Sequence, residues 1–147
     1  MKQYGLPRKA RLQKRSEYER VYQQGEKLGD RLLLLFMLPN ELGRSRVGVT
    51  VSRKHGKAVR RNRLKRLLKE AFRLSQHELP RGFDYVLIPR PRPEPAHLQE
   101  FQRSLKHLAA RLARRFQRQD LAAAPDVRDR QTAEPSTDRQ EPAPEAH

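Results

Sequence analysis

Residues 53–73, RKHGKAVRRNRLKRLLKEAFR, are the stretch whose residue types and spacing could do chemistry. They hold ten Lys and Arg residues and a single acid, Glu70. On a helix, at about 100° per residue, one face is apolar and consists of Leu64, Leu67, Leu68, Ala71 and, at its edge, Phe72. The opposite face and its flanks carry Asn62, Arg66, Lys69, Arg73, Arg61, Arg63 and Lys65. Such a helix docks on a sheet by its apolar face and presents guanidinium and ammonium groups to repeated phosphates.

The start of this helix strengthens the prediction of a phosphate-bearing partner. Arg60, Arg61 and Arg63 meet the positive end of the helix dipole, which is unfavourable unless an anion binds there. The free backbone N–H groups after Gly56 would themselves attract an anion. A solvated helix face is the ordinary alternative for a run of charge. Here the signs are unmixed and the run is rich in Arg, which binds phosphate by a planar fork, so a polyanion is favoured.

The composition agrees with a polyanionic partner. The chain has 147 residues with 33 Lys and Arg against 17 Asp and Glu, a net charge of +16. This excess fits nucleic acid, an anionic membrane surface or an acidic protein. Cysteine is absent, which excludes a disulfide, a thiolate zinc site and a cysteine nucleophile. The longest apolar run, Leu32–Leu38, is far shorter than the ~20 residues that span a bilayer, so a soluble cytoplasmic protein without a membrane partner is expected.

A helix is expected near the N-terminus to position part of the site. Ser16 and Glu19 form a capping-box pattern, and Gly25 suits the end of a helix. Between them, three side chains at helical spacing share one face: Tyr18, Val21 and Tyr22.

Three strands are expected next. Leu32–Leu38 is an unbroken apolar run that Pro39 ends, which predicts a buried strand. In residues 47–52, valines alternate with small or polar residues, namely Gly48, Thr50 and Ser52. That alternation predicts a strand with one apolar and one polar face. Phe83–Ile88 is a further strand, which Pro89 stops.

The last element expected is a helix from about Pro95 to Arg118. Its apolar stripe consists of Leu98, Phe101, Leu105, Leu108, Leu112 and Phe116. From residue 119 onward there are seven acids against three Arg, with repeated Ala and Pro and almost no large apolar residue. Such a segment buries too little surface to order itself. The sequence therefore predicts a basic domain over residues 1–118 and a disordered tail over 119–147.

Three segments resemble one known family. AVRRNRLKRLLKEAFR, Ala58 to Arg73, resembles the RNR signature of the bacterial ribonuclease P protein component. The resemblance extends upstream through RVGVTVSRKHGKAV and back to RLQKRSEYERVYQQG, Arg11 to Gly25. It also includes FDYVLIPRP, Phe83 to Pro91, and so covers roughly residues 8 to 115.

The resemblance implies an α+β sandwich with αβββαβα order and a small mixed sheet. It also implies a left-handed βαβ crossover through the Arg-rich helix, an exception to the usual hand, and a fourth strand that the residue pattern does not predict. In this family the catalytic subunit is an RNA that hydrolyses a phosphodiester with Mg²⁺. The partners implied are that ribonuclease P RNA and the 5′ leader of precursor tRNA, whose endonucleolytic removal gives the mature 5′ end. No protein partner and no protein metal site are expected.

The resemblance also assigns site residues by position. Those expected to contact the catalytic RNA are Arg61, Asn62, Arg63, Arg66, Lys69 and Arg73. Those expected to line a groove for the leader are Tyr18, Tyr22, Phe36, Thr50, Ser52 and Lys54. Aromatic rings stack on unpaired bases whatever the base, and small residues leave a floor that RNA can approach. The alternative for Tyr18, Tyr22 and Phe36 is a role in the core. The alternative for Thr50 and Ser52 is the solvent-exposed face of a strand.

No catalytic constellation is recognisable in the protein itself. The five histidines are scattered without metal-ligand spacing, and no catalytic residue is predicted. Two rival functions stay open on these residues. One is a ribosomal or other structural RNA-binding protein, which would not need a stacking groove apart from the basic helix. The other is a protein nuclease whose metal site is assembled only in three dimensions.

Overall fold

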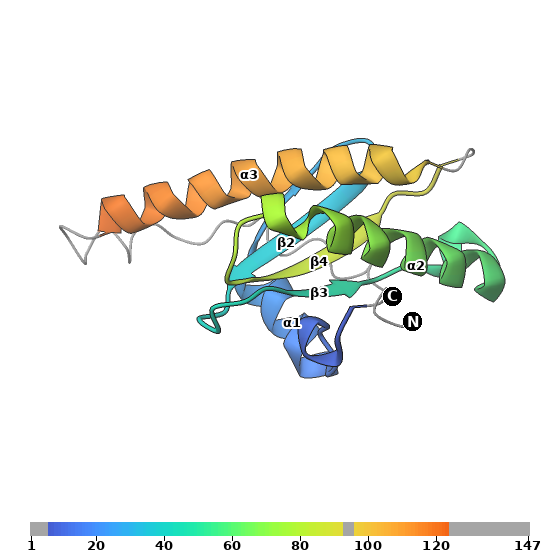
Figure 1. Cartoon of the computed structure of the whole chain (residues 1–147), viewed down its shortest axis with the longest axis horizontal. Helices are drawn as coiled ribbons and strands as arrows, with labels where there is room; N and C mark the ends of the chain where they lie inside the picture. The colour runs from blue at the N-terminus through green and yellow to red at the C-terminus, as the bar shows by residue number, and fades with distance from the viewer. Residues whose placement is uncertain (1–5, 93–95, 124–147) are drawn as a thin grey trace.

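The helices and strands follow the expected αβββαβα order (Figure 1). The computed structural model describes residues 6–92 and 96–123. Its elements are α1 Arg15–Gln24, β1 Glu26–Gly29, β2 Leu33–Pro39, β3 Arg46–Val49, α2 Ala58–Ser75, β4 Phe83–Pro89 and α3 Leu98–Ala123. Short 3-10 turns precede α1 and follow β3 and α2, namely η2 Arg8–Ala10, η3 Arg53–His55 and η4 Gln76–Glu78. The predicted fold class is confirmed.

The sheet is mixed and has four strands in the order β1-β2-β4-β3. β2 pairs antiparallel with β1 and with β4, whereas β3 pairs parallel with β4. Because α2 joins the parallel neighbours β3 and β4, the βαβ unit to which the resemblance assigns a left-handed crossover is present. β1, which the residue pattern missed, has only four residues and no apolar alternation, and its pairing with β2 defines it.

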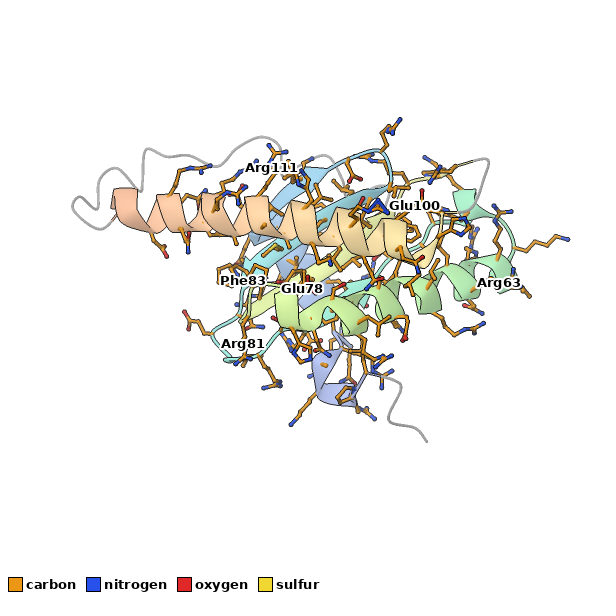
Figure 2. The ribbon with its side chains drawn as sticks, turned by 45° about the horizontal axis from the view of Figure 1, so that its top comes forward. Arg63, Glu78, Arg81, Phe83, Glu100 and Arg111 are labelled. Atoms are coloured by element: carbon orange, nitrogen blue, oxygen red, sulfur yellow. The ribbon has the colours of Figure 1, made fainter. Side chains whose placement is uncertain are left out.

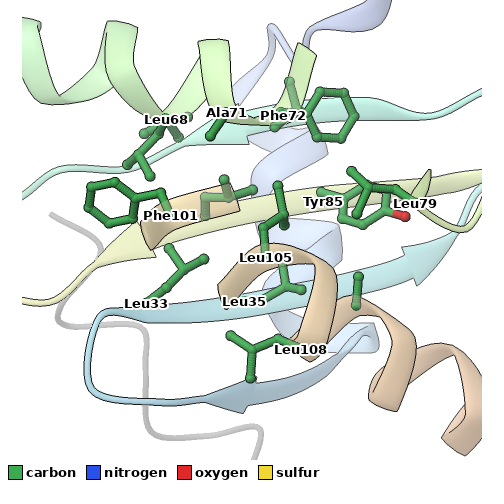
Figure 3. Packing of buried hydrophobic residues seen from close by; sticks show 14 of the residues in the cluster. Leu33, Leu35, Leu68, Ala71, Phe72, Leu79, Tyr85, Phe101, Leu105 and Leu108 are labelled. Atoms are coloured by element: carbon green, nitrogen blue, oxygen red, sulfur yellow. The ribbon is translucent and has the colours of Figure 1, made fainter. Parts of the chain in front are cut away.

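The two faces of the sheet are covered by different helices, so the protein has three layers. α2 and α3 lie over one face, where Leu68 and Leu105 pack on Leu35 and Tyr85 (Figure 3). α1 covers the other face, and its Val21 belongs to a second cluster with Leu12, Phe36, Leu38, Val86 and Ile88. Alternate residues of β2 and β4 thus enter different cores. A strand buried on both faces has no polar face, which explains the unbroken apolar run.

The start of α1 differs from the prediction. Glu17, not Ser16 with Glu19, caps it, because its Oε1 accepts hydrogen bonds from the amides of Gln13 (2.7 Å) and Lys14 (2.9 Å). The helix begins two residues earlier than a Ser16 cap requires, which puts Glu17 in the third helical position. The end at Gly25 is confirmed, since a Cβ there would lie 2.6 Å from the Val21 carbonyl oxygen.

α3 continues beyond its predicted end at Arg118. The side chains of Arg115 and Gln119 donate to the carboxylate of Glu26 on β1, over 3.4 Å and 3.3 Å, which ties this part of the helix to the sheet edge. The predicted boundary at residue 118 therefore falls inside α3, and the remainder of the predicted tail, 124–147, lies outside the described residues. Within the described part of the chain, no helix combines the length and apolarity needed to cross a bilayer.

Candidate RNA interface

α2 divides into an apolar and a cationic face, as its sequence predicts. Leu68, Ala71 and Phe72 are buried against the sheet, where Phe72 meets Tyr85 edge-on with ring centroids 5.3 Å apart. On the outer side, exposed side chains are those of Asn62, Arg63 and Arg66, and half-buried ones are those of Arg61, Lys69 and Arg73. Arg63 stands near the start of α2 among side chains that point away from the sheet (Figure 2). We call these six residues the cationic face.

The N-terminus of α2 is left open to an anion. Its N-cap, Lys57, makes no side-chain cap, and no acid occurs in the first turn. The first amides of a helix have no partner within the helix, so an anion is favoured there. Arg61 is held across this end because its Nε donates to the carbonyl oxygen of Gly56 over 3.1 Å. Gly56 has φ of +107°, a conformation that side chains rarely adopt, so a glycine is required at this turn.

Two members of the cationic face already have distinctive surroundings. Arg73 pairs with Glu70 through two hydrogen bonds of 3.0 Å and 2.6 Å, and this pairing lowers the pKa of Glu70. A phosphate would have to share or displace that carboxylate. Lys69 has a lowered pKa because of its burial and, next, of the positive charges of Arg11 and Lys65. The exposed residues, Arg63 and Arg66 among them, could therefore contact a phosphate without first losing a partner or a buried position.

A second candidate surface lies between α1 and β3. The ring of Tyr18 covers Gly48 so closely that a Cβ there would lie 2.6 Å from ring atoms Cε2 and Cζ. Tyr22 Oη and Thr50 Oγ1 share a hydrogen bond of 2.8 Å. Burial raises the pKa of both tyrosines, so both hydroxyls stay protonated. Both rings are half-buried, contacting the second core cluster while keeping part of their surface exposed.

Phe36 does not belong to this surface, which corrects the prediction. It is 0% exposed, because its register opposite Val86 places it mid-sheet under α1. Its ring meets that of Tyr22 edge-on, with centroids 5.0 Å apart at 75°. Phe36 therefore supports Tyr22 from below and offers no area to a ligand.

The remaining predicted groove residues follow β3. Thr50 is half-buried, and its amide donates to the Leu87 carbonyl oxygen over 3.0 Å. The Ser52 hydroxyl oxygen accepts the amide of Lys54 over 3.3 Å, so it caps the short turn η3. Lys54 is exposed. Tyr22 contacts Thr50 directly, and Ser52 and Lys54 follow Thr50 closely in the chain. We call the surface made of Tyr18, Tyr22, Thr50, Ser52 and Lys54 the aromatic face.

Comparisons with known proteins show the family of this chain. The family model described as "Ribonuclease P" matches residues 6–113. The chain belongs to this family. It is 40% identical over 101 residues to the ribonuclease P protein component of Clostridioides difficile, covering 68% of this chain and 89% of that protein. The corresponding protein of Pelotomaculum thermopropionicum is 41% identical over 100 residues, with the same coverage of both chains.

Solved structures in the family have the same fold. The ribonuclease P protein of Thermotoga maritima superposes with a TM-score of 0.63 at 34% identity, covering 69% of this chain and 96% of that one. The Staphylococcus aureus protein gives a TM-score of 0.60 at 29% identity, covering 67% of this chain and 91% of that one. Membership of the family makes this chain a ribonuclease P protein component, which links it to tRNA processing.

An ion-pair network that sequence reasoning missed positions the aromatic face. Arg46 of β3 donates to Asp84 of β4 from Nε (2.9 Å) and Nη2 (2.8 Å), and from Nη1 to Glu17 of α1 (3.1 Å). Asn40 Nδ2 also donates to Asp84 over 2.8 Å. Asp84 is 1% exposed. The network holds the first turn of α1 on the sheet, one residue before Tyr18. No local pattern pairs residues so far apart in the chain.

Two acids of the described residues, Asp84 and Asp30, have structural partners. Asp84 is bound by Arg46, and Asp30 accepts the amides of Leu32 and Leu33, each over 2.9 Å. Across residues 6–92 and 96–123, no three His, Asp or Glu side chains gather closely enough to hold a metal ion. No step of the chemistry is assigned to a metal held by the protein.

Proposed function

We propose that the protein binds ribonuclease P RNA through the cationic face of α2 and the 5′ leader of precursor tRNA along the aromatic face. It would thereby assist endonucleolytic removal of the leader in the bacterial cytoplasm. One observation supports the proposal: the chain carries two chemically different surfaces on separate elements, one cationic and one aromatic. A structural RNA-binding protein would need only the first.

The cationic face suits a folded RNA. Arg63, Arg66 and Asn62 are exposed on one side of a helix whose other side is anchored in the core. Guanidinium groups bind phosphate oxygens in pairs, and each contact that releases counterions adds to the salt dependence of binding. The uncapped first turn of α2 adds backbone donors at the same end.

The aromatic face suits a single strand. Each tyrosine is only half-buried, and a base can stack on a tyrosine ring without being identified by hydrogen bonds. Lys54, two residues after Ser52, offers an exposed charge for the strand's phosphates. In this proposal the RNA subunit hydrolyses the phosphodiester with its Mg²⁺, and the protein increases the affinity for substrates that carry a leader.

The test is cleavage of precursor tRNA at low Mg²⁺ by the protein alone, the catalytic RNA alone and the two together. We expect cleavage only with the RNA, and faster cleavage when the protein is added. Arg66→Ala should weaken the stimulation, whereas Arg111→Ala, an equal loss of charge on the exposed side of α3, should not. Cleavage by protein alone would indicate a protein nuclease, and no stimulation would indicate a structural RNA-binding protein.

A further inference from the structure

A small pocket joins the two candidate surfaces. It has a volume of about 280 Å³ and lies between η2, the start of α1, β3 and α2. Its polar lining consists of Arg8, Arg11, Gln13, Tyr18 and Lys69. Tyr18 belongs to the aromatic face and Lys69 to the cationic face, so the pocket lies where these two surfaces meet.

Arg11 is held in this pocket with an unused donor. Its Nε is buried and has no hydrogen-bond partner, an uncommon situation for a buried polar atom. The backbone at Arg11 is fixed to β3. Arg11 forms an isolated parallel bridge with Val47, and the Leu12 amide donates to the Val47 carbonyl oxygen over 2.9 Å. The guanidinium is thus fixed beside β3 with hydrogen-bonding capacity to spare.

The charges around the pocket are not balanced by the nearby acids. The charged groups that shift the pKa of Lys69 are Arg11 and Lys65, both positive. Glu17 is engaged by the amides of Gln13 and Lys14 and by Arg46, as described above. Glu70 is engaged by Arg73. Two cations, Arg11 and Lys69, therefore share a half-buried site that no acid lines, and the carboxylates of Glu17 and Glu70 already have other partners.

The Gln13 side chain holds Arg8, the third cation of the pocket, by two hydrogen bonds. Its Oε1 accepts from Arg8 Nε and its Nε2 donates to the Arg8 carbonyl oxygen, both over 3.1 Å. This pair of hydrogen bonds holds η2 against the start of α1. The pocket is therefore built from three segments that are far apart in the chain, namely residues 8–18, β3 and α2.

We propose that this pocket binds one phosphate group of an RNA backbone, with Arg11 and Lys69 as its main ligands. A phosphate has enough oxygens to accept from both cations, and its charge would offset their mutual repulsion. The assignment of this phosphate to RNA rests on the proposed function. In that proposal a leader base stacks on Tyr18, and Tyr18 lines the pocket. A strand on the aromatic face could thus place a phosphate beside α2.

The first experiment tests the pocket in the full-length protein without any RNA. Inorganic phosphate is titrated at constant ionic strength while backbone amide NMR signals are followed, with chloride as the reference anion. We expect saturable shifts at Arg11, Gln13 and Lys69, and roughly tenfold weaker binding in Lys69→Gln, as for one lost charge-assisted hydrogen bond. Lys9→Gln is the matched control, because Lys9 is exposed on η2 and does not line the pocket.

Equal weakening in Lys69→Gln and Lys9→Gln, in proteins that melt alike, would show diffuse attraction and overturn the pocket. So would the absence of saturable shifts at the pocket amides. Arg11→Lys provides a second variant that keeps the charge but removes the fork, and we expect intermediate affinity for phosphate. Unchanged affinity in Arg11→Lys would remove Arg11 from the ligands.

The second experiment identifies the source of the phosphate. Affinities of wild type and Lys69→Gln are compared for the catalytic RNA, for precursor tRNA bound to the assembled enzyme and for mature tRNA. A selective loss for precursor tRNA would assign the leader, and a loss in assembly would assign the catalytic RNA; both support an RNA phosphate. Loss of phosphate binding with every RNA affinity unchanged would overturn the RNA assignment. Failure of the wild type to bind catalytic RNA would refute the proposed function separately.

Discussion

Replacing Tyr18 by Ala should separate leader binding from every other property of the protein. The ring lies over Gly48, and Tyr18 is half-buried and also lines the pocket that contains Arg11 and Lys69. Stacking of a base on such a ring contributes about 1 to 3 kcal/mol. Precursor tRNA should therefore bind the assembled enzyme about one to two powers of ten more weakly, whereas mature tRNA and assembly with the catalytic RNA should be nearly unaffected.

The same substitution also lowers the stability of the fold, and the assay must distinguish this loss from the loss of affinity. A fully buried aromatic contributes about 3 to 5 kcal/mol to folding, so a half-buried ring over a glycine should contribute roughly half of that. A melting curve and a measurement well below the melting temperature keep the affinity comparison to folded protein. Tyr18→Phe is the matched control, because it keeps the ring and removes only the hydroxyl that bonds to the Val49 backbone.

We expect Tyr18→Phe to bind precursor tRNA within about twofold of the wild type, since stacking needs the ring and not the hydroxyl. Gly48→Ala offers an independent perturbation, because its Cβ would collide with the Tyr18 ring and shift it. That variant should also lose affinity selectively for the leader-bearing substrate. Equal losses for both tRNAs, or a Phe variant as weak as the Ala variant, would refute stacking at Tyr18.

Further predictions concern electrostatics. Arg66→Ala should lower the slope of log affinity for catalytic RNA against log salt by about 0.7 to 0.9, whereas Arg111→Ala should leave the slope unchanged. Equal slopes in the two variants would show that Arg66 does not contact the RNA. Arg46→Ala should lower the unfolding free energy in urea by about 3 to 5 kcal/mol, because it leaves Asp84 buried without its cation. The pKa of Glu17 is lowered from 4.5, first by the Lys14 and Gln13 amides. Its stabilisation is therefore present above 4.5 and lost as pH falls through the folded-state pKa, so the stability deficit of Glu17→Gln should shrink between pH 7 and pH 3.

Local periodicity was enough to predict most of the elements that carry the site. The cationic and apolar faces of α2 follow from the helical repeat, and burial of Leu68 and Ala71 confirms them. The strand character of β2, β3 and β4 follows from apolar runs and alternation, since side chains that must leave water recur with the period of the backbone. The strand β1 came from family resemblance alone, because four residues without alternation carry too little signal.

Which side chains meet one another was decided only by the tertiary structure. An apolar strand does not reveal its two faces, so Phe36 could not be assigned to the core until its register opposite Val86 was known. Nor does the spacing of Arg46 from Glu17 and Asp84 along the chain indicate their contact. The pocket of Arg11 and Lys69 depends likewise on the docking of α2 beside η2. Hydrophobic patterning is a local property of the chain, whereas polar pairing depends on the packing of distant elements. The ion pairs of Arg46 and the pocket of Arg11 and Lys69 were therefore revealed only by the tertiary structure.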